Sequence, residues 1–143
     1  LESGIIKEFN KSSEIKPEQR FGSNTRFDFL IKDKKNKSFI EVKNVTLSRT
    51  PMLAEFPDAV TSRGLKHIND LISAAKKGYR SYLFFVIQRN DCNKFSIAKD
   101  IDPQYSKLLT VALRNNVKII CYDCKFSSKG IKLNKKIKLQ IHE

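Results

Sequence analysis

Hydrophobic positions recur with a period of two near the start of the chain, which predicts a pair of strands. In residues 25–32, TRFDFLIK, Phe27, Phe29 and Ile31 are apolar, an incomplete alternation typical of a strand. The residues DKKN that follow supply turn formers, and residues 38–47 then resume with β-branched side chains. The pattern predicts a β-hairpin.

Two longer segments carry apolar residues at helical spacing. Residues 61–77 form an amphipathic pattern that ends at Gly78, and Asp58 before it is expected to cap the helix. Asp102 and Pro103 are an N-cap and first-turn pair that open a second helix. The sequence therefore predicts two helices after the hairpin.

Nearly continuous apolar runs follow each helix, at residues 80–88 (RSYLFFVIQ) and 117–122 (VKIICY). Runs of this length are typical of strands that are covered on both faces. The order hairpin, helix, strand, helix, strand predicts an α/β fold, a mixed sheet flanked by helices with right-handed crossovers. With 143 residues, the chain is expected to be one domain.

Residues 129–141, KGIKLNKKIKLQI, combine lysines with a rough period of two and contain no acid. The segment predicts an edge strand with a lysine-rich outer face. The lysines either discourage strand-to-strand aggregation or follow a phosphate backbone, and the pattern leaves both interpretations open.

The net charge of the chain indicates what kind of partner it binds. The 28 Lys and Arg residues outnumber 15 acids, for a net charge of +13 and a pI near 9.8. Such a surface attracts polyanions, and nucleic acid is the first candidate. No stretch approaches the ~20 apolar residues of a membrane span. Three cysteines without a secretory signal indicate a reducing, cytoplasmic location, with no membrane partner.

Candidate chemistry lies on the predicted hairpin. Glu41 and Lys43 are two apart in a strand and share a face. If DKKN forms a four-residue loop, the register places Asp28 opposite Glu41. Two facing carboxylates require a shared proton or a divalent cation, and oxygen ligands suit Mg²⁺ or Mn²⁺.

A cation held by Asp28 and Glu41, with the carbonyl of Val42, could polarise a phosphoryl oxygen while Lys43 positions the attacking water. Such a site would cleave phosphodiesters. The alternative interpretation is an ordinary cross-strand salt bridge on a half-exposed hairpin.

The segments RFDF, FIEVKNVTL, FPDAVTSRGLKHINDL, YLFFVIQRND and IDPQYSKLL resemble the SfsA (sugar fermentation stimulation protein A) family in order and spacing. The resemblance runs from about Glu18 to the C-terminus. It implies a PD-(D/E)xK, restriction-endonuclease-like domain, preceded in the family by an OB-fold domain. The family is associated with DNA binding and with regulation of sugar (maltose) metabolism genes in bacteria.

Carried over by motif, the resemblance implies that Asp28 and Glu41 are the metal carboxylates and that Lys43 is the catalytic lysine. In the wider superfamily an acid on a preceding segment often joins the site, and Glu18 is the candidate, with Glu14 behind it. The chain departs from the pattern at Phe27, where the superfamily has proline. The OB-fold domain is absent from residues 1–143, which are expected to be the nuclease-like domain alone.

The resemblance also places the first helix beside the hairpin, so that Asp58 is a candidate outer metal group. The candidate nucleic-acid-binding residues are Arg26, Arg63, Lys66 and Arg89. His67 is expected to be structural, as lone histidines usually are. CYDC at residues 121–124 has metal-ligand spacing but lacks a second cysteine pair, so zinc is not expected.

Two functions from different classes remain open. One is a Mg²⁺- or Mn²⁺-dependent nuclease that hydrolyses DNA without reading bases. The other is a non-catalytic DNA-binding regulator of sugar (maltose) metabolism genes, in which the acidic cluster is structural. No small-molecule cofactor is expected, and the sequence leaves the oligomeric state open.

Overall fold

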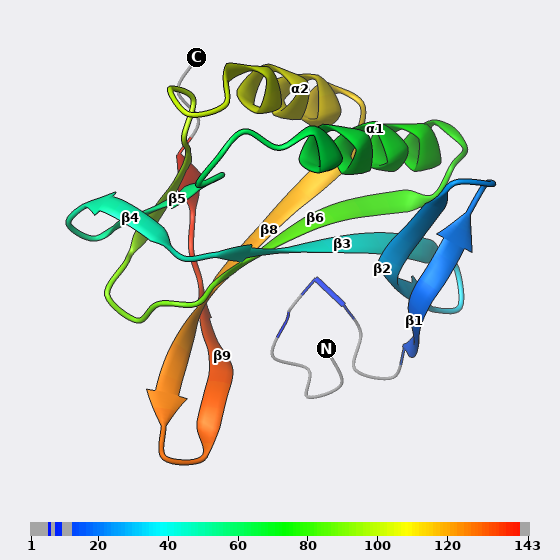
Figure 1. Cartoon of the computed structure of the whole chain (residues 1–143). Coiled ribbons are helices and arrows are strands. Elements are labelled where there is room, and N and C mark those ends of the chain that lie inside the picture. Colours follow the sequence, from blue (N-terminus) through cyan, green and yellow to red (C-terminus); the bar gives the residue numbers. More distant parts are fainter. Residues whose placement is uncertain (1–5, 7, 10–12, 141–143) are drawn as a thin grey trace.

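A six-stranded mixed sheet forms the centre of the structure, a computed structural model that describes residues 6, 8–9 and 13–140 (Figure 1). The three middle strands are parallel and the outer pairs are antiparallel. In spatial order the strands are β1 (Glu14–Phe21), β2 (Thr25–Lys32), β3 (Lys37–Val45), β6 (Arg80–Ile87), β8 (Val117–Ser127) and β9 (Gly130–Lys136). This restriction-endonuclease-like mixed sheet is the predicted fold class, and β6 occupies its middle as its apolar run indicated.

Both helices lie on one face of this sheet (Figure 1). α1 (Ser62–Lys76) precedes β6, and α2 (Pro103–Arg114) precedes β8. Crossovers of one hand place successive helices on the same face when the parallel strands advance in one direction, as β3, β6 and β8 do. Neither helix is long and apolar enough to cross a membrane. The face that carries α1 and α2 therefore holds the main core.

The N-terminus of α1 is capped by Thr61, and the expectation that Asp58 caps it was wrong. Oγ1 of Thr61 accepts the N–H of Gly64 at 2.9 Å. Asp58 is exposed and lies in the connection before the helix. Gly78 ends the helix as predicted, with a φ of 93° that favours glycine.

Asp102 ties the two helix N-termini together. Its Oδ1 accepts the N–H of Tyr105 at 3.0 Å in the first turn of α2, so it is the predicted N-cap. Its Oδ2 accepts the N–H of Thr61, the cap residue of α1, also at 3.0 Å. Because Asp102 is 2% exposed, both bonds are shielded from water. One buried carboxylate thus fixes how the two helices begin.

A second, four-stranded sheet was not predicted. It contains, in spatial order, β10 (Leu139–Gln140), β7 (Lys94–Ile97), β5 (Leu53–Phe56) and β4 (Leu47–Thr50). Arg49 secures it with hydrogen bonds of 2.8 and 2.9 Å to Glu55 and of 2.6 and 2.8 Å to Asp100. Strands of two or four residues contain too few positions for a period of two to be recognised.

β1 is the other unpredicted strand, and it forms one edge of the large sheet. Both of its faces are largely solvated, so its sequence EIKPEQRF shows no alternation. Pro17 is tolerated because an edge strand need not donate every N–H. Glu18 has a φ of 51° and interrupts the pairing with β2 between Pro17 and Gln19.

The opposite face of the large sheet carries a smaller apolar cluster. Ile40, Phe84 and Ile120 belong to it, and Ile6 packs on it from the N-terminal segment. Phe9 makes an edge-on contact with Tyr82 at 4.9 Å. The residues of β3 therefore alternate between this cluster and the helix side, and that alternation decides where Glu41 and Lys43 point.

Candidate active site

The register of the β2–β3 hairpin is the predicted one. Lys32 pairs with Lys37, and the ladder continues to Phe29 opposite Ile40. The next position would bring Asp28 opposite Glu41, but the backbone ladder stops one step earlier. The backbone pairing of β2 with β3 is therefore interrupted at Asp28.

Asp28 replaces the missing backbone pair with its side chain. Its Oδ2 accepts the N–H of Val42 at 2.7 Å. Val42 lies between the two charged residues of β3, so the carboxylate of Asp28 is fixed beside both of them. The sequence predicted that these residues meet, and the structure shows that a side-chain to backbone bond joins the strands there.

Glu41 and Lys43 face the helix side, where His67 of α1 meets them. Nδ1 of His67 lies 2.6 Å from Nζ of Lys43 and 3.1 Å from Oε1 of Glu41. Nζ of Lys43 lies 3.8 Å from the same Oε1. The side chains of Glu41, Lys43 and His67 are only 6%, 15% and 14% exposed. We refer to Glu41, Lys43 and His67 as the buried polar triad.

Burial controls the protonation of the triad. It raises the pKa of Glu41 to about 7, with a further contribution from the negative charge of Asp28, against the opposing effect of Lys43. Burial also lowers the pKa of Lys43, against the stabilising charges of Glu41 and Asp28. Each charged form is disfavoured because little water reaches it.

His67 is neutral at physiological pH. Burial, followed by the charges of Lys43 and Arg63, lowers its pKa to about 4. A proton on Nδ1 would face the ammonium of Lys43 at 2.6 Å, so the approach to Glu41 is not an ion pair. Neutral His67 instead accepts a hydrogen bond from Lys43 and so fixes the direction of the lysine head.

Two buried oxygens beside the triad have no hydrogen-bond partner among the described residues. One is Oε2 of Glu41, and the other is the hydroxyl of Tyr105, which is fully buried. Burial raises the pKa of Tyr105, with further contributions from the negative charges of Asp102 and Glu41. An unpartnered buried carboxylate oxygen with a raised pKa is a site that a cation would stabilise.

The residues present fit a divalent cation in the kind of ligand they offer. Asp28 and Glu41 supply carboxylates beside the carbonyl of Val42, and hard oxygen ligands are those that Mg²⁺ and Mn²⁺ prefer. In the described part of the chain, no three Asp, Glu, His or Cys side chains converge as a ready metal cluster. A cation here would thus depend on two carboxylates and on oxygens from the backbone, water or substrate.

Glu18 of β1 lies near Asp28, but on the face of the sheet opposite to Glu41 and Lys43. It lines a shallow hollow of about 490 Å³ together with Asp28 and Val42. Glu14, the residue behind it, instead forms an exposed ion pair with Lys16 at 3.6 Å. Glu18 is therefore placed beside Asp28, while Glu14 is directed elsewhere.

The candidate binding residues on the α1 side differ in their relation to the triad. Arg63 is exposed, and its charge acts on all three members of the triad. Lys66 is occupied by Asp70 at 2.9 Å and by the carbonyl of Asn24 at 3.0 Å. Asp58 is exposed in the connection before α1. Arg63 is therefore the candidate whose charge affects the pKa of every member of the triad.

The remaining basic candidates lie on other parts of the surface. Arg89 is engaged by Asp91 at 2.7 Å and by the carbonyl of Thr46 at 3.1 Å. Arg26 is exposed on the edge hairpin, directly opposite Arg20. Arg26 and Arg20 thus form a paired positive charge that is separate from the triad.

The sequence did not predict that His67 lies against Glu41 and Lys43, where the structure has it. A signal for His67 existed, because Gly64, His67, Leu71 and Ala74 follow the helical spacing of one face of α1. Three of these four are buried, so a histidine among them faces the sheet. No comparable signal in the sequence marked the buried, unpartnered hydroxyl of Tyr105.

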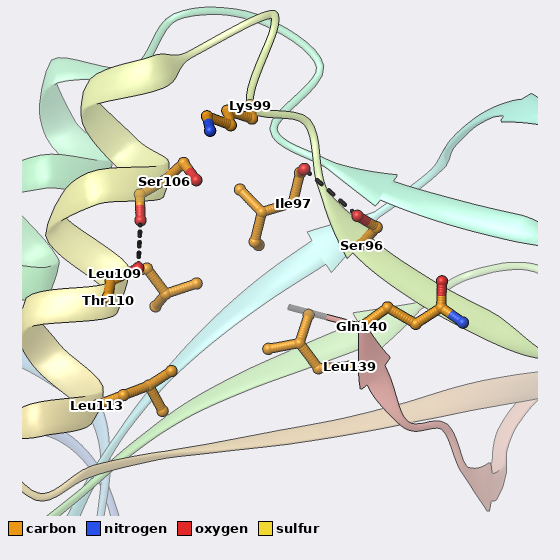
Figure 2. Close-up of a pocket in the computed structure, with 9 residues that line it drawn as sticks. All are labelled: Ser96, Ile97, Lys99, Ser106, Leu109, Thr110, Leu113, Leu139 and Gln140. Atoms are coloured by element: carbon orange, nitrogen blue, oxygen red, sulfur yellow. Dashed lines mark hydrogen bonds between the residues drawn. The ribbon is translucent and has the colours of Figure 1, made fainter. Parts of the chain in front are cut away.

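A second hollow is lined mostly by apolar and hydroxyl side chains. Figure 2 shows it between α2, β7 and β10. Its volume is about 50 Å³. Its hydroxyls serve local bonds, from Thr110 to the carbonyl of Ser106 at 3.2 Å and from Ser96 to the carbonyl of Ile97 at 3.4 Å. The hollow is lined by Ser96, Ile97, Lys99, Ser106, Leu109, Thr110, Leu113, Leu139 and Gln140. No carboxylate is among these lining residues.

The mixed sheet, the helices on one face and the hairpin carboxylates define a restriction-endonuclease-like domain, and comparison with known proteins agrees. The family model described as "Sugar fermentation stimulation protein RE domain" matches residues 1–130. The chain belongs to the sugar fermentation stimulation protein family.

Individual relatives show the same relationship. A "Sugar fermentation stimulation protein homolog" of Pelagibacter ubique is 50% identical over 139 residues, which are 97% of this chain and 60% of that protein. The homolog of a Ruegeria species is 42% identical over 134 residues, covering 93% of this chain and 58% of the relative. The chain thus spans about three fifths of the length of these relatives.

A solved structure shares the fold closely. It is described as Pyrococcus furiosus SfsA in complex with Ca²⁺, and it matches with a TM-score of 0.87 and 28% identity. The match covers 98% of this chain and 60% of that one. The fold described above is therefore that of the SfsA relative.

Proposed function

We propose that this chain is the nuclease domain of a DNA-binding protein and hydrolyses phosphodiester bonds with Mg²⁺ or Mn²⁺. The observation that carries the proposal is the buried polar triad beside Asp28. Burying a carboxylate, an ammonium and an imidazole costs stability, and such perturbed groups concentrate at functional sites. A salt bridge that served only stability would not require the unpartnered Oε2 of Glu41.

The net charge of +13 supports DNA as the substrate, because a phosphodiester backbone is the commonest polyanion that a basic protein meets. The Ca²⁺ named with the Pyrococcus relative supports a divalent cation at carboxylate oxygens. Asp28 and Glu41 would hold the cation, with the carbonyl of Val42. When bound, the cation would polarise the phosphoryl oxygen and acidify a water.

The chain's own residues would prepare the site for substrate. Asp28 holds β2 against the backbone of β3 and fixes the spacing of the carboxylates. Lys43, oriented by His67, would stabilise the negative charge that develops on the phosphate. Arg63 is exposed nearby and would contact the adjacent backbone phosphate.

The proposal is tested by incubating supercoiled plasmid with the protein in Mg²⁺, Mn²⁺ or EDTA. Cleavage is expected with either metal and is expected to stop in EDTA. Asp28→Asn and Lys43→Met should each lower the rate by roughly 100-fold or more, since each removes a charge from the reaction centre. Lys34→Ala removes a lysine from an exposed turn and should leave the rate unchanged.

Equal cleavage by the wild type, Asp28→Asn and Lys43→Met would reveal a contaminating nuclease and defeat the proposal. Salt-dependent DNA binding without cleavage in either metal would favour the regulator of sugar metabolism genes instead. In that case Asp28→Asn should bind DNA at least as well as the wild type, because a carboxylate near phosphate repels it.

A further inference from the structure

The outer half of the β8–β9 hairpin stands apart from the rest of the large sheet. β8 pairs with β6 only as far as Asp123, and beyond it β8 pairs with β9 alone. Every residue from Lys125 to Lys136 is exposed except Leu133, which is partly buried. Figure 1 shows this two-stranded ribbon leaving the body on the side away from the helices. We call residues 125–135 the ribbon.

The ribbon concentrates positive charge without compensation. Lys125 lies directly opposite Lys132, an arrangement in which like charges repel. Lys136, just beyond the ribbon, pairs with Glu8 at 2.8 Å. The ribbon's own lysines form no ion pair with any described residue, and residues 125–135 include no acid. These unpaired lysines are Lys125, Lys129, Lys132 and Lys135.

An exposed apolar pair follows the lysine pair along the ribbon. Phe126 lies opposite Ile131, and they are 46% and 58% exposed. Because neighbouring residues of a strand point to opposite faces, the two apolar side chains and the Lys125–Lys132 pair occupy different faces. Lysines that only protect an edge from aggregation would not accompany an exposed phenylalanine. The combination fits a partner that offers both phosphates and apolar ring surfaces.

The ribbon also has a defined relation to the triad. Lys43 pairs with Phe85, and Phe85 pairs with Cys121, so these three residues share one face of the sheet. Lys125 follows Cys121 by four positions on that face. Strand spacing and rise place Lys125 roughly 16 Å from Lys43, the length of a few nucleotides. A two-stranded ribbon is also narrow enough for a DNA major groove of about 12 Å.

We propose that the ribbon is a nucleic-acid-binding arm in which the lysines contact backbone phosphates and Phe126 and Ile131 contact the bases. The proposal rests on the proposed function in taking DNA as the partner, and it adds a surface outside the cleavage site. The arm would thus add a contact to DNA beyond the C-terminal ends of the parallel strands. Neither a metal nor cleavage is required for this contact.

The test is the salt dependence of binding, measured by fluorescence anisotropy with a labelled DNA duplex in EDTA. The double variant Lys125→Ser/Lys132→Ser should bind more weakly. Its slope of log affinity against log salt should be shallower by roughly two, one for each lost phosphate contact. Lys34→Ser/Lys35→Ser removes the same charge from the β2–β3 turn and should retain the wild-type slope.

Phe126→Ala tests the apolar part separately. It should weaken binding several-fold at an unchanged salt slope, because it removes a base contact and leaves the phosphate contacts in place. The melting temperature of the double lysine variant should equal or exceed that of the wild type, since like-charge repulsion is relieved. A loss of affinity accompanied by a lower melting temperature would be structural and would overturn the proposal.

The remaining outcomes separate this proposal from the cleavage site. If both double lysine variants lost the same DNA affinity, binding would depend on net charge alone. That result would overturn the proposal that the ribbon is a binding arm. Binding to phosphatidylserine vesicles with none to DNA would identify a membrane contact and overturn it as well. If the ribbon variants alter DNA binding while the wild type cleaves in neither metal, the arm stands and the nuclease proposal fails. If cleavage proceeds and the ribbon variants bind normally, only the arm fails.

Discussion

Nζ of Lys43 and Nδ1 of His67 lie 2.6 Å apart, although 24 positions separate the two residues along the chain. The contact joins β3 to α1 across the crossover connection. It uses one N–H direction of the lysine, so the lysine head is held near Glu41 at 3.8 Å. In the proposed reaction, His67 would therefore act through Lys43.

Replacing His67 should show this positioning role. His67→Leu is expected to lower the initial rate of metal-dependent plasmid cleavage by roughly tenfold or more, because a misplaced catalytic group is less effective. His67→Asn retains a hydrogen-bond acceptor and should recover part of that rate. Asn69→Ala, on the exposed side of α1, is the control and should cleave normally. Identical rates for the Leu and Asn variants would contradict the role.

The pH dependence of stability should contain two opposing contributions. The pKa of Glu41 is raised from 4.5 to about 7, so its contribution is complete below 4.5 and is lost as pH rises to 7. The pKa of His67 is lowered from 6.5 to about 4, so its contribution is complete above 6.5 and is lost as pH falls to 4. Between pH 4.5 and 6.5 the two slopes oppose each other.

Replacing one of the two residues should reveal the pH dependence of stability that the other contributes. In urea unfolding with EDTA, Glu41→Gln should become less stable as pH falls below 6.5, and His67→Asn less stable as pH rises toward 7. Each slope is at most about 1.4 kcal/mol per pH unit, the value for one proton. Parallel pH profiles for the two variants would show that the assigned pKa directions are wrong.

Loss of Asp102 should destabilise both helix beginnings at once. Asp102→Ala removes acceptors for the N–H groups of Tyr105 and Thr61 and should lower the free energy of unfolding by about 2–3 kcal/mol. Asp102→Asn keeps one oxygen and should cost less. Asp58→Ala, an exposed change in the connection before α1, should stay within about 0.5 kcal/mol of the wild type in the same urea titration.

Gly64→Ala should destabilise the protein although alanine is the better helix former. A Cβ at Gly64 would lie 2.7 Å from Cγ2 of Thr61 and 3.0 Å from Cε2 of Tyr105. Relieving these clashes must disturb either the cap or the buried ring, at a cost of about 1–3 kcal/mol. Ser73→Ala on the exposed side of α1 should instead be neutral or slightly stabilising. Greater thermal stability of Gly64→Ala would disprove this account.

The order of the main elements followed from the sequence because each gave a strong local signal. Residues 25–32 coincide with β2, and Asp102 caps α2 just before Pro103. The four-residue loop predicted the register from Lys32 opposite Lys37 as far as Phe29 opposite Ile40. The lysine-rich segment was correctly placed at an edge, as β9. Local pattern and turn length were sufficient in these cases.

Features that depend on tertiary contacts did not follow from the sequence. The strands of the small sheet are short, and β1 is solvated on both faces, so neither showed a usable period. The bond from Asp28 to the N–H of Val42 depends on an interruption of the ladder. Thr61 replaced Asp58 as the cap because the helix begins at Ser62. Ile141, which was assigned to the last strand, lies outside the described residues.

The long-range pairing of β3 decides when the site comes into existence. Glu41 pairs with Leu83 on β6, and it contacts His67 on α1. Both contacts require segments of the chain that are synthesised after β3. Parallel pairings between distant segments form slowly. Until they form, the carboxylate of Glu41 is hydrated and has ordinary acidity. Its raised pKa is acquired only when α1 docks on the sheet, so a partly folded chain lacks the buried polar triad.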